Sequence, residues 1–159
     1  MKKALLLPAI CLLLASCGGG NSEKGKNPYQ QDGDSKKEAN GNPSYDPQRG
    51  EGKFTHVDVS PTLNAEMAAN GKKAYDVKCN SCHKLSAEKL VGPGWQGVTS
   101  RHTAEWIMNF ATNTDAMINK DPKAQAMLEL CMVRMPNQNL SDEDARSLYE
   151  FMRQNDGVK

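Results

Sequence analysis

Two cysteines and a histidine stand close together in the sequence Cys79-Asn-Ser-Cys82-His83. A pair of thiols three residues apart, followed directly by an imidazole, is the spacing at which a c-type haem is attached to a protein. Each thiol would form a thioether with a haem vinyl group, and His83 would bind the iron as its proximal ligand. The motif therefore predicts one covalently bound haem c, with Cys79 and Cys82 as its attachment points.

Zinc is the alternative that this motif leaves open. A structural zinc ion takes four tetrahedral ligands, so one further side chain would have to join the two thiols and the imidazole. The candidates elsewhere in the chain are Cys131, His56 and His102. None of them forms a second closely spaced pair, and the sequence therefore favours haem over zinc.

A second iron ligand is expected on a loop that faces His83. Met135 precedes Pro136, which stops a helix and pushes the residue before it towards an extended conformation. A thioether on such a stiff loop suits axial ligation, so we predict Met135 as the second metal ligand. Met132, still on the helical pattern, is the nearest competitor. Three other methionines are expected to fill the apolar core: Met67, Met127 and Met152.

The first 16 residues are typical of an export signal. Lys2 and Lys3 form a charged start, residues 4–14 are apolar, and a stretch of small residues ends at Cys17. The apolar stretch is too short to remain in a bilayer as a spanning helix. Its end, Leu-Ala-Ser-Cys17, resembles a bacterial lipobox, which implies a lipoprotein signal peptide over 1–16 and lipidation of Cys17. The alternative is an ordinary cleaved signal peptide in which Cys17 has no role.

Residues 17–60 are expected to form a lipid-anchored, flexible and disordered linker. Their composition is dominated by Gly, Asn, Ser, Lys, Glu, Gln and Pro. Such a segment cannot bury enough apolar surface to offset the entropy lost on ordering. Positive and negative charges nearly cancel, so the segment looks like a spacer and not like a basic membrane patch. A weak alternation over 54–59 predicts a short extended strand near its end that packs at the entry to the domain.

The remaining residues, 61–159, have the size of one domain, and their periodicity predicts an all-α fold. Side-chain caps, or a cap followed by proline, mark several helix starts. Four helices are expected, over 64–78 and from Thr103, from Asp121-Pro122 and from Ser141. Residues 112–120 look like an enlarged loop.

The domain resembles a small monohaem cytochrome c of the class with methionine and histidine ligands. Gly71 and Tyr75 resemble the family's first helix, where a glycine allows the last helix to cross closely and an aromatic residue packs beside it. The resemblance implies Tyr149 as the aromatic partner on the last helix. Gly92-Pro93 resembles the family's turn in which the proline carbonyl accepts a hydrogen bond from the proximal histidine. The implied fold is a helical domain wrapped around one covalent haem.

The resemblance also implies two residues near the haem propionates. Arg101, eight residues after Pro93, matches in spacing a family arginine that forms a hydrogen bond there. The family's propionate-binding tryptophan is assigned to Trp106, with Trp95 as the other possibility. Cys131 is expected to be a small buried hydrophobic residue, and a thiolate ligand is its alternative role.

An iron with both axial positions filled has no open site for a substrate, so outer-sphere electron transfer is the expected function, without enzymatic catalysis. The resemblance implies redox partner proteins: a quinol-oxidising complex as donor, and a terminal oxidase or a periplasmic reductase as acceptor. The protein is expected to be a monomer, anchored by lipid to the periplasmic side of a bacterial membrane. The formal net charge is only +1, and no nucleic-acid partner is expected.

Two alternatives concern the distal side of the haem. In the first, the distal site is labile or open, and the protein senses or reacts with a small ligand. In the second, His102 replaces the methionine and the iron has two histidine ligands.

Overall fold

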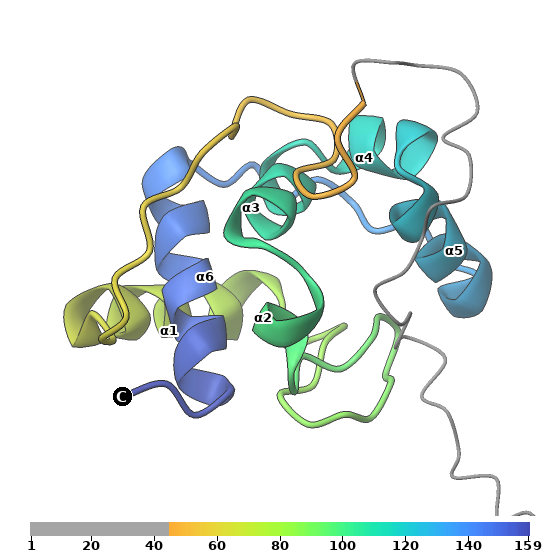
Figure 1. The fold of residues 1–159 in the computed structure, drawn as a ribbon. Coiled ribbons are helices and arrows are strands. Elements are labelled where there is room, and N and C mark those ends of the chain that lie inside the picture. Colours follow the sequence, from red (N-terminus) through yellow and green to blue (C-terminus); the bar gives the residue numbers. More distant parts are fainter. Residues whose placement is uncertain (1–44) are drawn as a thin grey trace, which may run out of the picture. The chain divides into compact units, whose positions relative to one another are not determined.

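The computed structural model describes residues 45–159. The predicted signal peptide, Cys17 and the linker up to residue 44 lie outside the described residues. Within 45–159 the regular secondary structure is helical, which confirms the all-α prediction, and no helix in this range is long and apolar enough to cross a membrane. The helices are α1 (Ala65–Lys78), α2 (Val98–Arg101), α3 (Ala104–Thr112), α4 (Thr114–Lys120), α5 (Pro122–Cys131) and α6 (Asp142–Asn155) (Figure 1).

Four side-chain caps set the helix starts that the sequence predicts. In each, a side-chain oxygen accepts a hydrogen bond from the backbone N–H three residues later, which satisfies one of the free donors of the first turn. The capping residues are Asn64 for α1, Thr103 for α3, Asp121 for α5 and Ser141 for α6. The last of these forms a complete capping box with Asp144.

Helices α1 and α6 cross at close range, as the resemblance implied. A Cβ atom added at Gly71 would lie 2.0 Å from the carbonyl oxygen of Ser147, so a glycine is needed at this crossing. One turn later Tyr75 packs on Phe151, with 5.5 Å between the ring centroids. The prediction of Tyr149 as this partner is wrong. Tyr149 and Phe151 are two positions apart on α6, so their side chains point to nearly opposite sides of the helix.

A buried carboxylate joins the start of α1 to α6. Glu150 is fully buried and accepts hydrogen bonds from Arg146 at 2.6 Å, Arg153 at 2.7 Å and the backbone N–H of Asn64 at 2.8 Å. Burial acts to raise the pKa of Glu150, but these hydrogen bonds outweigh it and hold the pKa below its usual value. Two arginines on one acid therefore satisfy a charge that would otherwise be costly to bury.

Two helices were not predicted. The expected loop over 112–120 contains α4, whose Met117 and Ile118 are buried, and α2 is a single short turn. Helices of seven and four residues are too short for a hydrophobic period to be recognised in the sequence.

The chain before α1 also differs from its prediction. The linker was expected to reach residue 60, but residues 45–60, which we call the strap, pack along the helices (Figure 1, orange to yellow). Gly50 is buried there, and Phe54 and Val57 pack against the core. No strand forms over 54–59; instead, the N–H of Val57 donates to the carboxylate of Glu105 at 2.8 Å. The packed part of the domain therefore begins at least sixteen residues earlier than predicted.

Candidate haem-binding site

The Cys79–His83 motif forms a tight turn at the end of α1. The carbonyl oxygen of Cys79 accepts hydrogen bonds from the backbone N–H of Cys82 at 3.0 Å and of His83 at 2.9 Å. Neither cysteine is part of a disulfide, and Cys79 is buried at the end of the helix. Before a haem is attached, burial raises the pKa of the Cys79 thiol to about 11. The turn brings Cys82 and His83 to the edge of one pocket.

The imidazole of His83 is held in one orientation. Its Nδ1 lies 2.8 Å from the carbonyl oxygen of Pro93, which makes Nδ1 the protonated nitrogen and leaves Nε2 for a metal ion. The hydroxyl of Tyr75 donates to the carbonyl of His83 at 2.8 Å. A Cβ atom at Gly92 would lie 2.4 Å from Cε1 of the ring, so glycine is needed beside it. Burial lowers the pKa of His83, and the hydrogen bond to Pro93 only partly opposes this, so the ring is neutral as a ligand must be.

An open apolar pocket is lined by His83 and Cys82. The rest of the wall consists of residues 91–93, Phe110 of α3, Ile118 of α4, Ala124, Met127, Leu128 and Cys131 of α5, and residues 133–136. Met127, expected in the core, packs against it and also lines the pocket, and Cys131 lines the pocket as well.

Met135 lines the same pocket as His83. At the end of α5 the backbone of Met132 turns into the left-handed region, with a φ of 57°. This turn takes the chain out of the helix and leaves the Met132 side chain 84% exposed. Met135, followed by Pro136, is partly buried against the core. The structure thus brings Met135 to the pocket and keeps Met132 outside it.

The side chain of Trp106 does not line the pocket and packs against other residues. Its ring stacks between His102 and Phe110, at centroid distances of 4.0 and 5.2 Å. Its indole N–H donates to the carboxylate of Asp121 at 2.9 Å. The sequence indicated Asp121 only as a helix cap, so nothing in the spacing showed this partner. The tryptophan beside His83 is Trp95, with 5.5 Å between the ring centroids.

Arg101 and His102 also lie outside the pocket lining. The guanidinium of Arg101 donates to the carbonyl oxygens of Gln96 at 2.6 Å and Gly94 at 3.3 Å. It therefore binds the segment that follows Pro93. His102, the alternative second ligand, stacks on Trp106 instead of facing His83.

The residues of the pocket fit a covalently attached haem. Its wall is apolar, and it brings together a neutral imidazole, a thioether and one of two free thiols. Within residues 45–159 no three His, Cys, Asp or Glu side chains gather as a zinc site would require. These side chains suit a haem iron better than a zinc ion.

Comparison with known proteins agrees with this geometry. The sequence model of the cytochrome c family matches residues 68–156. A solved cytochrome c from Rhodothermus marinus is 30% identical, with a TM-score of 0.64, covering 66% of this chain and 90% of that one. An engineered cytochrome c from the same organism is 28% identical, with a TM-score of 0.63 and the same coverage. A search of curated proteins gives no match.

The helical fold and the site define a protein of the c-type haem class. The chain belongs to the cytochrome c family. It carries a covalently attached haem c through the motif of Cys79, Cys82 and His83, and its function is haem-based electron transfer with redox partners.

Proposed function

We propose that this protein is a membrane-tethered electron carrier whose haem iron is held between His83 and Met135. The supporting observation is that one apolar pocket is lined both by His83, with Nε2 available to a metal, and by Met135. The haem supplies an iron that changes between the ferrous and ferric states. Two protein ligands leave no iron position for a substrate, which favours outer-sphere transfer over catalysis.

The protein's own residues set the properties of such a centre. The Pro93 carbonyl fixes the tautomer of His83 and raises the basicity of the nitrogen that binds the iron. A thioether as second ligand raises the reduction potential relative to a second histidine. The apolar wall excludes water and keeps both ligands in place when the charge of the iron changes.

The proposal places the domain outside the cytoplasm, on the periplasmic side of a bacterial membrane. It rests on the export signal and the lipobox-like sequence ending at Cys17, which lie outside the described residues. The proposed donor is a quinol-oxidising complex, and the proposed acceptor is a terminal oxidase or a periplasmic reductase. The carrier is proposed to act as a monomer.

A second candidate function is a haem protein with a labile distal site that senses or reacts with a small ligand. One observation favours it. An engineered Rhodothermus marinus cytochrome c, 28% identical and with a TM-score of 0.61, was solved bound to a carbene intermediate. Applied to this chain, the idea requires that Met135 leaves the iron and that a ligand enters in its place.

The optical spectrum of the oxidised protein separates the two functions. Electron transfer through a six-coordinate iron predicts a weak near-infrared methionine-to-iron band that disappears in Met135→Ala and persists in Met132→Ala, the matched control. A high-spin spectrum in the unmodified protein, with rapid binding of cyanide or carbon monoxide, would instead support the second function. Oxidation rates of the ferrous protein with a purified oxidase and with a periplasmic reductase would then identify the acceptor.

A further inference from the structure

The helices that form the pocket fall into two groups. Helix α1 packs mainly on α6, α4 packs on α5, and α3 contacts both groups. His83 follows α1, whereas Met135 follows α5. A movement of the α4–α5 pair relative to the α1–α6 pair would therefore change the separation of the two proposed ligands.

The strap is fastened at its first end to α4 and α5. The hydroxyl of Tyr45 donates to the carboxylate of Asp121, the cap of α5. The backbone N–H of Glu51 donates to the sulfur of Met117 at 3.0 Å. The side-chain carboxylate of Glu51 pairs with the ammonium group of Lys120 at 3.0 Å. These contacts lie on the group of helices that carries Met135.

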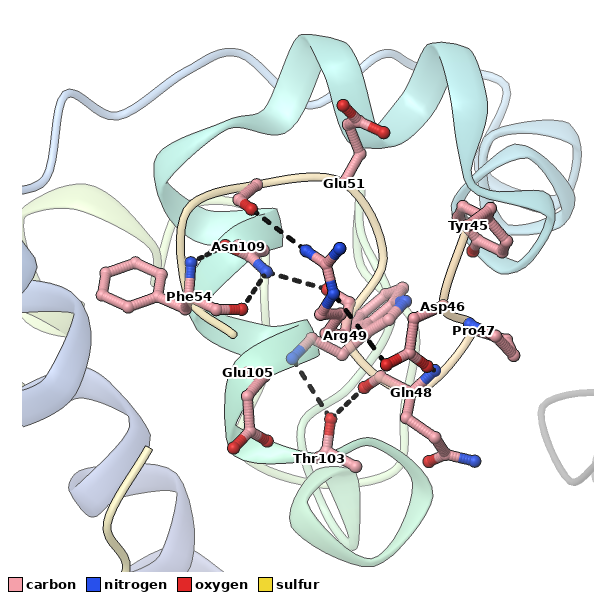
Figure 2. A network of polar contacts seen from close by, with 12 residues as sticks. Tyr45, Asp46, Pro47, Gln48, Arg49, Glu51, Phe54, Thr103, Glu105 and Asn109 are labelled. Carbon is pink, nitrogen blue, oxygen red and sulfur yellow. Dashed lines mark hydrogen bonds and ion pairs between the residues drawn. The ribbon is translucent and has the colours of Figure 1, made fainter. Parts of the chain in front are cut away.

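The middle of the strap is held by one buried amide of α3 (Figure 2). Asn109 is fully buried and donates to the carbonyl oxygens of Arg49 and Phe54, both at 2.9 Å. Its side-chain oxygen accepts a hydrogen bond from the N–H of Phe54, also at 2.9 Å. Three hydrogen bonds thus fix the strap to the helix that contacts both groups.

The last part of the strap is fastened to α6. Arg153 donates to the carbonyl oxygen of Ser60 at 2.7 Å, and Arg146 donates to that of Asp58 at 3.4 Å. Lys53 also pairs with Asp142 at the start of α6. One continuous segment therefore joins the α4–α5 group to the α1–α6 group.

We propose that the strap is a positioning element for Met135, which it keeps in the pocket by holding the two helix groups together. No strap residue lines the pocket, so the strap acts through the helices and not by touching the haem. The strap lies before residue 68, where the match to the family's sequence model begins. The inference rests on the proposed ligation by Met135.

Two variants loosen the strap without altering the pocket. Tyr45→Phe keeps the ring and removes only the hydrogen bond to Asp121. Gly52→Ala places a Cβ atom 2.2 Å from Oδ1 of Asn109, and the strap has to lift to relieve this contact. The test measures the rate at which cyanide binds to the ferric, full-length, haem-loaded protein, because cyanide binds where Met135 has left.

Both variants are expected to bind cyanide about tenfold faster than the unmodified protein. Tenfold corresponds to about 1.4 kcal/mol, close to the contribution of a hydrogen bond to a charged group. The near-infrared band should weaken in parallel, and the backbone amides of Phe54 and Val57 should exchange hydrogen faster.

Two control variants separate positioning from general loosening. His56→Ala changes an exposed strap side chain that pairs with Asp58, another strap residue, and its cyanide rate should stay within twofold. Asn64→Ala removes the cap of α1, about 20 Å of helix away from Cys79, and should lower stability without speeding cyanide binding.

Cyanide rates within twofold of the unmodified protein in both strap variants would overturn the inference. An equal acceleration in Asn64→Ala would overturn it as well. If the Gly52→Ala protein does not bind haem, the cyanide-binding rate of Tyr45→Phe alone tests the inference. If Met135 does not bind the iron at all, the unmodified protein lacks a near-infrared band that depends on Met135. That result is distinct from a strap that has no effect on cyanide binding.

Discussion

Among residues 45–159, His102 has the one fully buried side-chain polar atom without a hydrogen-bond partner, its Nδ1. The ring stacks on Trp106 at 4.0 Å between centroids. Burial, helped by the positive charges of Lys123 and Arg101, lowers the pKa of His102 to about 4. The imidazole is therefore neutral in the folded protein at pH 7, and folding opposes its protonation.

His102 should make stability fall as the pH is lowered from about 6.5 to 4. In this range the unfolded chain binds a proton on His102 that the folded protein excludes, so the loss reaches roughly 3 kcal/mol near pH 4. His102→Phe keeps the stack on Trp106 and removes the titration, so its stability should depend less on pH. Urea unfolding of both proteins between pH 4 and 7 measures the difference.

Equal pH slopes for the two proteins would contradict this prediction. Glu150 also makes stability depend on pH, but at lower pH: because its pKa is depressed in the folded protein, stability falls only below about pH 4.5. This effect of Glu150 is the same in both proteins and cancels in the comparison.

At the residue level, local backbone chemistry made some site positions predictable. Pro136 distinguished Met135 from Met132, because proline restricts the residue before it. The surroundings of Trp106 were not predictable in this way. Its partner Asp121 is fifteen positions away, and a cap residue carries no sign in the sequence that it also accepts an indole N–H.

The α1–α6 crossing depends on the absence of a side chain at one position. Gly71→Ala should lower the free energy of unfolding by about 1 to 3 kcal/mol, because the new Cβ would lie 2.0 Å from a backbone oxygen of Ser147. The better helix propensity of alanine offsets only part of this loss. Denaturant unfolding provides the measurement.

Asn70→Ala is the matched control for the crossing, since it changes an exposed neighbour on the same helix. It should alter the free energy of unfolding by less than about 0.5 kcal/mol. A Gly71→Ala variant as stable as Asn70→Ala would show that the two helices can move apart at little cost.

At the level of elements, helix starts could be predicted and the strap could not. Four helices begin at residues with a capping oxygen, so each start is encoded within about four positions. The order of the strap depends instead on the Asn109 amide, 55 positions after Phe54. The disorder prediction came from the composition of residues 17–60 taken together, which carries no information about such a distant partner.

For the whole molecule, the proposed anchor predicts a covalent lipid. Cells that express the protein in the presence of radioactive palmitate should label it, and Cys17→Ala should abolish the label. Cys11→Ala is the control, because this cysteine lies in the predicted signal peptide and its variant should remain labelled. An unlabelled unmodified protein would remove the anchor from the proposed function.

The strap also limits how far the haem can travel from a lipid on Cys17. Because Tyr45 is bound to Asp121, 28 residue steps separate the anchor from the domain, in place of the 44 steps to residue 61. A chain of 28 steps spans at most about 90 to 100 Å, against about 150 Å for 44 steps. If Cys17 carries the proposed lipid, residue 45 stays within this shorter radius of the membrane surface, and a redox partner has to meet the domain that begins there.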